Sequence, residues 1–146
     1  MGIENRIIET FDEAETQAFA REFAGTLRAG DVVLLNGDLG AGKSVFSRAL
    51  IRRLCGRENM EVPSPTFTLV QTYETSDFVI WHFDLYRLSD PSEIYEIGWE
   101  EALSGGVLLV EWPERLQGLC PDHVTEINIF THEDAANKRT IEIKQT

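Results

Sequence analysis

Residues 32–44 read VVLLNGDLGAGKS, an apolar run followed by a glycine-rich segment that ends in lysine and serine. The largely apolar run over residues 31–35 predicts a short strand that is buried on both faces. Residues 37–44 satisfy the pattern G-x-x-x-x-G-K-[ST], and residues 43–54 predict a helix that ends at Gly56. The dipeptide Asn36-Gly37 is also common in hairpin turns. However, a chain of this length contains the whole pattern by chance in only about one case in a hundred, so we interpret the loop as a phosphate-binding loop, or P-loop.

The residue types of this loop suit a polyphosphate and its magnesium ion. Glycines let the backbone turn its N–H groups inward, and the start of the helix adds the positive end of its dipole. Lys43 is expected to reach the β and γ phosphates, and the Ser44 hydroxyl is expected to supply one Mg²⁺ ligand. The predicted nucleotide-binding residues are Asp38, Leu39, Gly40, Ala41, Gly42, Lys43, Ser44 and Val45. Residues 137–140 read NKRT and lack the aspartate of an NKxD guanine reader, so ATP with Mg²⁺ is the expected ligand.

Two further apolar runs each end in a carboxylate. Residues 79–84 end at Asp84 and residues 107–111 end at Glu111. A P-loop needs an acidic residue on a neighbouring strand to hold Mg²⁺ or to orient water, so we expect at least one of the two in the metal shell. The alternative is that both are structural residues at strand ends, and the spacing does not divide the metal and water roles between them.

Two side chains near these runs have open interpretations. Thr66 follows Pro65 and precedes a predicted strand, so it is either a switch threonine that senses a γ-phosphate or a threonine that starts a strand after a proline-rich turn. His82 lies within an alternating strand, where a packed histidine is favoured over a general base.

The rest of the chain predicts helices and hairpins around the central strands. Thr10 and Glu13 form a predicted capping box for a first helix, and Asp90 with Pro91 predicts a helix over residues 90–103. Residues 66–73 with 78–84, and residues 123–131 with 140–144, predict two β-hairpins. The fold class is therefore α/β: a single P-loop NTPase domain over residues 1–146, with a mixed parallel and antiparallel sheet flanked by helices.

The composition of the chain limits the classes of partner and the cellular compartment that we expect. Asp and Glu number 25 against 13 Lys and Arg, for a net charge of −12, which disfavours direct binding of nucleic acid. A cluster of four arginines (Arg48, Arg52, Arg53 and Arg57) is the exception; it is either a solvated helix face or a docking surface for an acidic or phosphate-bearing partner. The two cysteines form no CxxC pair, and no apolar run approaches the length of a membrane span. A soluble cytoplasmic protein with no membrane contact is expected.

Four segments in series carry a resemblance to a known family. Residues 37–44 (GDLGAGKS), 63–67 (PSPTF), 82–87 (HFDLYR) and 111–113 (EWP) are similar to motifs of the TsaE (YjeE) ATPases, which assist bacterial synthesis of threonylcarbamoyladenosine in tRNA. The resemblance implies a P-loop fold and Mg²⁺-dependent ATP hydrolysis that is slow in the protein alone. It also implies action in a complex with the TsaD and TsaB proteins, in which hydrolysis resets the conformation and tRNA is met only through the complex.

The resemblance also implies roles for individual residues. Thr66, Asp84 and Glu111 would be the catalytic residues, with Ser44 and Glu111 in the metal shell and Asp84 on the side of the attacking water. Ser44 and Val45 stand where threonines are usual in the family; serine keeps the hydroxyl that binds metal. No motif for adenine contacts is evident, and the candidates are Thr10, Phe11 and Arg139, each of which is equally well a surface residue.

Two other function classes compete with this interpretation. A small P-loop kinase would transfer the γ-phosphoryl group to a metabolite, and we would expect an arginine-rich lid or an acceptor pocket in such an enzyme. A nucleotide-dependent scaffold would bind ATP with negligible chemistry, and Asp84 and Glu111 would then be structural.

Overall fold

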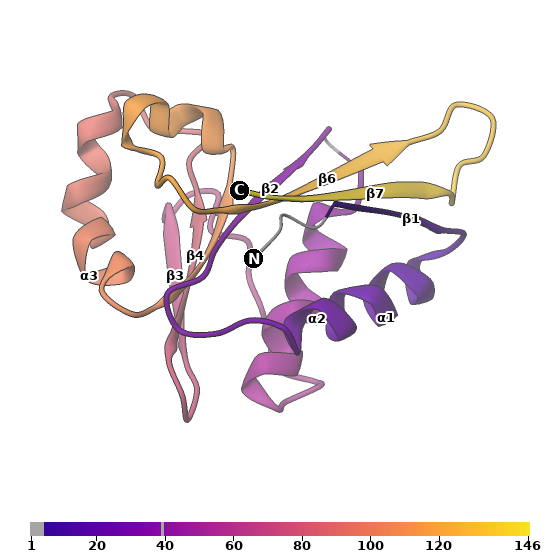
Figure 1. The fold of residues 1–146 in the computed structure, drawn as a ribbon, viewed down its shortest axis with the longest axis horizontal. Coiled ribbons are helices and arrows are strands. Elements are labelled where there is room, and N and C mark those ends of the chain that lie inside the picture. Colours follow the sequence, from indigo (N-terminus) through magenta and orange to yellow (C-terminus); the bar gives the residue numbers. More distant parts are fainter. Residues whose placement is uncertain (1–4, 39) are drawn as a thin grey trace.

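The computed structural model describes residues 5–38 and 40–146. Seven strands form one mixed sheet in the order β1-β7-β6-β2-β5-β4-β3, with helices on both faces (Figure 1). The α/β fold class with a mixed sheet is thereby confirmed. The strands are β1 (Arg6–Thr10), β2 (Val32–Gly37), β3 (Val70–Glu74), β4 (Val79–Asp84), β5 (Val107–Glu111), β6 (Thr125–Thr131) and β7 (Arg139–Gln145).

The parallel strands lie at the centre of the sheet. Strand β2 pairs in parallel with both β5 and β6, and β4 pairs in parallel with β5. Both predicted hairpins, β3–β4 and β6–β7, are antiparallel, and β1 adds an antiparallel edge next to β7. The register places Glu111 beside both Leu35 and Asp84. Because parallel strands end at the same edge of a sheet, the loop after β2 and the two carboxylates meet there.

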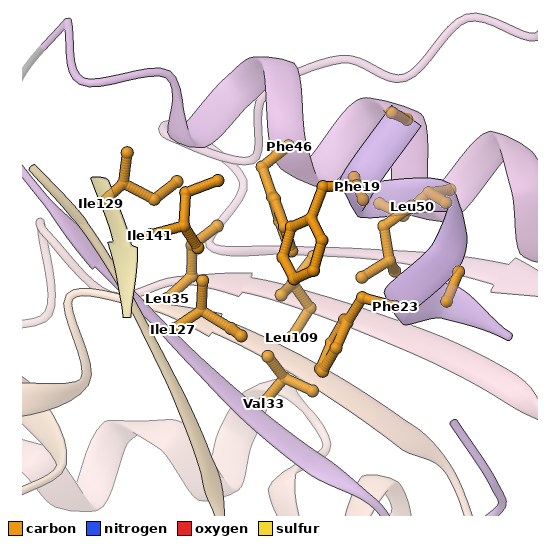
Figure 2. Packing of buried hydrophobic residues seen from close by; sticks show 14 of the residues in the cluster. Phe19, Phe23, Val33, Leu35, Phe46, Leu50, Leu109, Ile127, Ile129 and Ile141 are labelled. Carbon is orange, nitrogen blue, oxygen red and sulfur yellow. The ribbon is translucent and has the colours of Figure 1, made fainter. Parts of the chain in front are cut away.

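Two helices cover one face of the sheet. They are α1 (Glu13–Ala24) and α2 (Lys43–Cys55), and α2 begins and ends where the sequence predicts, to within one residue. Phe19, Phe23 and Phe46 pack with their ring centroids 6.0 to 6.4 Å apart. Figure 2 shows these rings in the same buried cluster as Val33 and Leu35 of β2. Side chains on this face of β2 and its neighbours therefore anchor the helix that follows the glycine loop.

Short helices cover the opposite face. They are η1 (Pro91–Ile97), α3 (Trp99–Leu103) and η2 (Pro113–Leu119), and Figure 1 shows them across the sheet from α1 and α2. Val32 and Leu34 of β2 point into this second core, where Trp99 is buried. Alternate residues of β2 thus face two different cores, as predicted for a central parallel strand. Within the described part of the chain, no helix is both long and apolar enough to cross a membrane.

The start of the first helix differs from the prediction. Asp12, not Thr10, caps α1, and its side chain accepts a hydrogen bond from the Glu15 N–H at 2.8 Å. Thr10 ends strand β1 and is buried, with its Oγ1 2.7 Å from Thr16 Oγ1. Strand β1 itself is not predicted by the sequence, because its adjacent isoleucines do not alternate and its partner strand lies at the far end of the chain.

Two other segments are shorter than predicted. The expected helix over residues 90–103 is divided into η1 and α3 at Gly98, whose φ of 95° breaks the helical path. The expected cap of Asp90 and the proline at the first helical position are both present. Strand β3 begins at Val70 rather than at residue 66, because Leu69 has a left-handed φ of 69° and its N–H bonds to the Pro65 carbonyl at 2.7 Å.

Candidate functional site

A cavity of about 630 Å³ lies between the start of α2 and the carboxyl ends of β4 and β5. It brings together all three predicted catalytic residues, Thr66, Asp84 and Glu111. Of the predicted loop residues, the ones that line it are Gly40, Gly42, Lys43, Ser44 and Val45, joined by Ser64, Tyr86 and Trp112 from other segments.

The remaining predicted loop residues lie elsewhere or outside the described chain. Leu39 is not among the described residues. Asp38 lines a neighbouring cavity of about 250 Å³, which shares Lys43 and Trp112 with the main cavity. The Ala41 side chain is buried in the core under α1 and α2. Asp38 and Ala41 are joined by a backbone hydrogen bond within the loop, in which the Asp38 carbonyl accepts the Ala41 N–H at 2.9 Å.

The backbone of the loop requires glycine at defined positions. Gly40 and Gly42 have φ values of 84° and 106°, a region that residues with a Cβ rarely adopt. A Cβ on Gly37 would lie 3.1 Å from the Ile129 carbonyl oxygen. The first N–H groups of a helix have no intrahelical acceptor. Gly42 is the N-cap of α2 and has no side chain that would accept hydrogen bonds from them. A helix start of this kind binds anions.

Arg139 of β7 holds this loop from behind. Its Nε donates to the Ala41 carbonyl at 2.7 Å, and its Nη2 makes a longer contact of 3.4 Å with the Gly40 carbonyl. Nη1 donates to the carbonyls of Ala136 and Lys138 at 2.7 and 2.9 Å. One guanidinium group thus ties two carbonyls of the loop to the turn before β7. No local sequence signal predicts this role, because 98 residues separate Arg139 from Ala41.

Arg139 also lines a smaller cavity of about 80 Å³, together with residues that include Gly42, Val45 and Thr16. Of the three candidates for adenine contacts, only Arg139 lies next to the loop in this way. Thr10 is buried against Thr16, and Phe11 is exposed.

Lys43 rests on an aromatic ring. Its Nζ lies 4.4 Å from the centroid of the Trp112 ring, within the range of a cation–π contact. Trp112 follows β5 with a left-handed φ of 57°, and Tyr86 packs on it with a centroid separation of 4.9 Å. Backbone strain at a bulky residue beside a cavity is typical of functional sites. Trp112 therefore forms a wall of the cavity as well as packing at the strand end.

Asp84 connects the sheet to the loop that carries Thr66. As a whole residue, Asp84 is only 5% exposed. Its Oδ2 accepts a hydrogen bond from the Thr66 hydroxyl at 3.2 Å, and its Oδ1 accepts the Tyr86 N–H at 3.1 Å. The Thr66 Oγ1 also lies 2.7 Å from the Ser64 Oγ. The proline-containing loop is thereby attached to the carboxylate at the end of β4.

Glu111 is paired with His82. The residue Glu111 is 7% exposed and His82 is 2% exposed, and the Glu111 Oε2 lies 2.7 Å from the His82 Nε2. Since the carboxylate accepts, His82 donates from Nε2, and its buried Nδ1 has no hydrogen-bond partner among the described residues. His82 is thus buried as predicted, but it also orients Glu111. No described residue bonds to the Glu111 Oε1, and Glu111 lines the cavity.

The residues present fit a magnesium ion that is bound together with phosphate. Mg²⁺ takes a few hard oxygen ligands from protein and fills its octahedron with phosphate and water. Ser44 and Glu111 line the main cavity together and also share a small neighbouring cavity of about 10 Å³, about the room for one water molecule. Within residues 5–38 and 40–146, no cluster of three or more His, Cys, Asp or Glu side chains would hold a metal without such a ligand.

The chain is similar in sequence to proteins of one known family. Residues 10–141 match the sequence model of the family described as "Threonylcarbamoyl adenosine biosynthesis protein TsaE". The tRNA threonylcarbamoyladenosine biosynthesis protein TsaE of Rickettsia bellii is 52% identical over 84% of this chain and 84% of its own. The protein of the same name from Haemophilus influenzae is 38% identical over 86% and 82%.

A solved structure shows the same fold. The crystal structure of Bacillus subtilis YdiB superposes with a TM-score of 0.77 at 28% identity, covering 99% of this chain and 88% of that one. Fold and site geometry together point to an activity that involves a nucleotide. From the match over most of its length, the chain belongs to the TsaE family of proteins that act in the biosynthesis of threonylcarbamoyladenosine in tRNA.

Proposed function

We propose that this protein binds ATP with Mg²⁺ in the 630 Å³ cavity and hydrolyses it slowly. One observation carries the proposal: Lys43 and Ser44, at the open start of α2, share a single cavity with the buried carboxylates of Asp84 and Glu111. Cation, hydroxyl and paired carboxylates around an anion-binding helix start are the parts that phosphoryl transfer from a nucleotide requires.

Each residue has a part in this proposal. The ammonium group of Lys43 would leave the Trp112 ring for the phosphates, because a charge-assisted hydrogen bond is stronger than a partly exposed cation–π contact. Ser44 and Glu111 would hold the Mg²⁺, which supplies charge neutralisation on the phosphates when it is bound. His82 would keep Glu111 Oε2 occupied, so that Oε1 is the oxygen turned to the metal.

Asp84 and Thr66 would form the side that receives the attacking water. Asp84 would accept a hydrogen bond from the water, and Thr66 would sense the γ-phosphate with the hydroxyl that now bonds to Asp84. Phe67, the next residue on this loop, is 79% exposed and lies 4.5 Å from the Arg87 guanidinium. A movement of Thr66 would therefore be expected to move the exposed Phe67 side chain, which a partner protein could contact.

In the cell, we propose that hydrolysis resets the conformation of a modifying complex with TsaD and TsaB in the cytoplasm, with tRNA met only through that complex. The names of the relatives support the pathway, and the position of Thr66 directly before the exposed Phe67 supports a conformational role. Residues 1–146 would act as one ATPase domain.

The kinase alternative has less support from the cavity. Lys43 is the only cationic side chain among the described residues that line it. A kinase lid would be expected to bring arginine to the transferred phosphoryl group. Release of inorganic phosphate from MgATP without any added acceptor would distinguish hydrolysis from transfer to a metabolite.

Calorimetric titration with MgATP tests the binding site. Lys43→Ala should weaken the affinity by about tenfold or more, because a phosphate in a partly closed cavity loses a charged donor. Lys144→Ala removes the same charge from an exposed position in β7 and serves as the control. Equal affinity in the Lys43→Ala variant and the wild type would refute the proposed site.

The division of roles between the carboxylates has its own test. Glu111→Gln should raise the Mg²⁺ concentration that gives half-maximal phosphate release. Asp84→Asn should instead lower the maximal rate at saturating Mg²⁺ with little change in that concentration. The opposite pattern would exchange the two assignments, and no effect of either substitution would favour the scaffold interpretation.

A further inference from the structure

A second large cavity lies outside the nucleotide site, on the outer side of α1 and α2. Its volume of about 610 Å³ is close to that of the nucleotide cavity. We call it the arginine groove. It is lined by Gln17 and Arg21 of α1, by Val45, Arg48, Ala49, Arg52 and Arg53 of α2, and by Gly56, Glu58 and Asn59 after α2.

The arginine groove is strongly cationic in a strongly acidic protein. Among its described lining residues four are arginines and only Glu58 carries a carboxylate, although the chain as a whole carries a net charge of −12. Among the described residues, none of the four arginines forms an ion pair with a carboxylate. The arginine cluster predicted from the sequence is thus joined by Arg21, while Arg57 does not line the groove.

Two of the four arginines are partly buried rather than fully solvated. Arg48 and Arg52 are half-buried, and the Arg52 Nε donates to the Met60 carbonyl at 2.8 Å. This bond holds the Arg52 side chain in place while its two Nη groups have no partner among the described residues. Like charges held together without counter-ions favour an anionic ligand, and arginine binds carboxylate or phosphate through two parallel hydrogen bonds.

The chemistry of the walls favours a protein over a nucleic acid. Val45 and Ala49 give the groove a small apolar floor, and no aromatic ring on which a base would stack is among its described lining residues. An extended phosphate backbone would also pass close to the acidic remainder of the surface. Charges closer than the screening length, about 8 Å at physiological salt, are not fully screened, so this surface would repel the backbone. A short segment that carries carboxylates beside small apolar side chains meets both the charged rim and the floor.

We propose that the arginine groove docks an acidic segment of a partner protein. Carboxylates of that segment pair with Arg21 from one wall and Arg53 from the other, and small apolar side chains rest on Val45 and Ala49. The groove shares α2 with the nucleotide site: Val45 lines both large cavities, and Arg48 lines the small cavity beside Ser44 and Glu111. Docking does not require nucleotide hydrolysis, so the proposal stands independently of the ATPase activity.

Fluorescence anisotropy of a labelled peptide tests the proposal on the full chain without nucleotide. The probe is a peptide of about twelve residues in which glutamates alternate with alanine and leucine, and total tRNA is the second probe. The test variant is Arg21→Glu with Arg53→Glu, because both side chains are exposed and neither makes a side-chain hydrogen bond to a described residue. Arg6→Glu with Arg28→Glu makes the same change of charge away from the groove and is the matched control.

The expected result is that the wild type binds the peptide, more weakly as salt increases, and that the test variant binds it at least about tenfold more weakly. The control pair should stay within about twofold of the wild type. Arg21→Gln with Arg53→Gln, which adds no negative charge, should give an intermediate loss, and circular dichroism checks that each variant is folded. Absence of peptide binding, equal binding by the test variant, or tighter binding of tRNA that depends on the same arginines would overturn the proposal.

Discussion

Replacement of Arg139 by alanine should both destabilise the protein and weaken nucleotide binding. The substitution removes the guanidinium group that bonds to the carbonyls of Ala41 and Gly40 in the P-loop and of Ala136 and Lys138 in the preceding turn. Hydrogen bonds to a charged group contribute about 1.5 to 3 kcal/mol each when they are buried. Arg139 is only half-buried, its contact with Gly40 is long, its bond to Ala136 is exposed and its bond to Lys138 joins adjacent residues. We therefore count only the partly buried 2.7 Å bond to Ala41 at full strength.

The expected loss of unfolding free energy is therefore about 2 kcal/mol. For a chain of 146 residues this corresponds to a decrease in Tm of about 4 to 8 °C. Affinity for MgATP should fall about tenfold, a loss of about 1.4 kcal/mol, because the loop must then find its anion-binding conformation without the bonds that hold its carbonyls outward. Thermal unfolding followed by circular dichroism measures the first effect, and calorimetric titration with MgATP measures the second.

Arg139→Lys is the informative control. A lysine keeps the charge but lacks the planar fork that reaches several carbonyls. We therefore expect a Tm and an MgATP affinity between those of the wild type and Arg139→Ala. A Tm within 1 °C of wild type, about the error of the measurement, together with unchanged MgATP affinity in Arg139→Ala would refute the role of Arg139 in holding the loop. A lower Tm with unchanged affinity would restrict that role to stability.

Three further predictions concern packing, backbone and cysteine chemistry. Phe46→Ala should lower the unfolding free energy in urea by about 3 to 5 kcal/mol, because Phe46 is fully buried between the helices and the sheet; a loss below 1 kcal/mol would contradict this packing. Gly98→Ala should lower the free energy of unfolding by at least about 1 kcal/mol, because φ is 95° and the added Cβ would lie 2.8 Å from the Trp81 ring. An unchanged urea midpoint would show instead that the chain relaxes around the added methyl group. Burial raises the pKa of the Cys55 and Cys120 thiols above the ordinary value of 9.0, so folded stability should hold below pH 9 and fall as the pH rises further. Replacing both cysteines with serine should reduce that fall, and urea unfolding at neutral pH and above pH 9 checks it.

The part of the site that the sequence predicts is the part that local chemistry determines. The P-loop depends on glycines, a lysine and a serine at fixed spacing between a strand and a helix, and this order persists in the structure. Asp84 and Glu111 were expected near the loop because each ends an apolar strand, and parallel pairing brings these ends to one sheet edge. Each of these inferences needs only short-range patterns and one rule of topology.

The features that the sequence does not predict depend on contacts between distant segments. Strand β1 forms through its pairing with β7 at the other end of the chain, and the role of Arg139 requires the same long-range closure. The cap of α1 shows a local competition: Thr10 and Asp12 are both suitable caps, and pairing of Thr10 in the sheet leaves Asp12 to begin the helix. The arginine groove likewise needs Arg21 of α1 beside the arginines of α2, which no spacing in either helix indicates alone.

The proposed function is hydrolysis of ATP with Mg²⁺ in this cavity, coupled to a partner complex. The measurement that tests it most directly is steady-state phosphate release at saturating MgATP by the protein alone and with TsaD and TsaB, with Glu111→Ala as the control. We expect slow release alone, faster release with the partners, and release at background level in the variant, which removes the carboxylate that lines the cavity with Ser44. No release under any condition while ATP still binds, or a Glu111→Ala variant as active as the wild type, would contradict it.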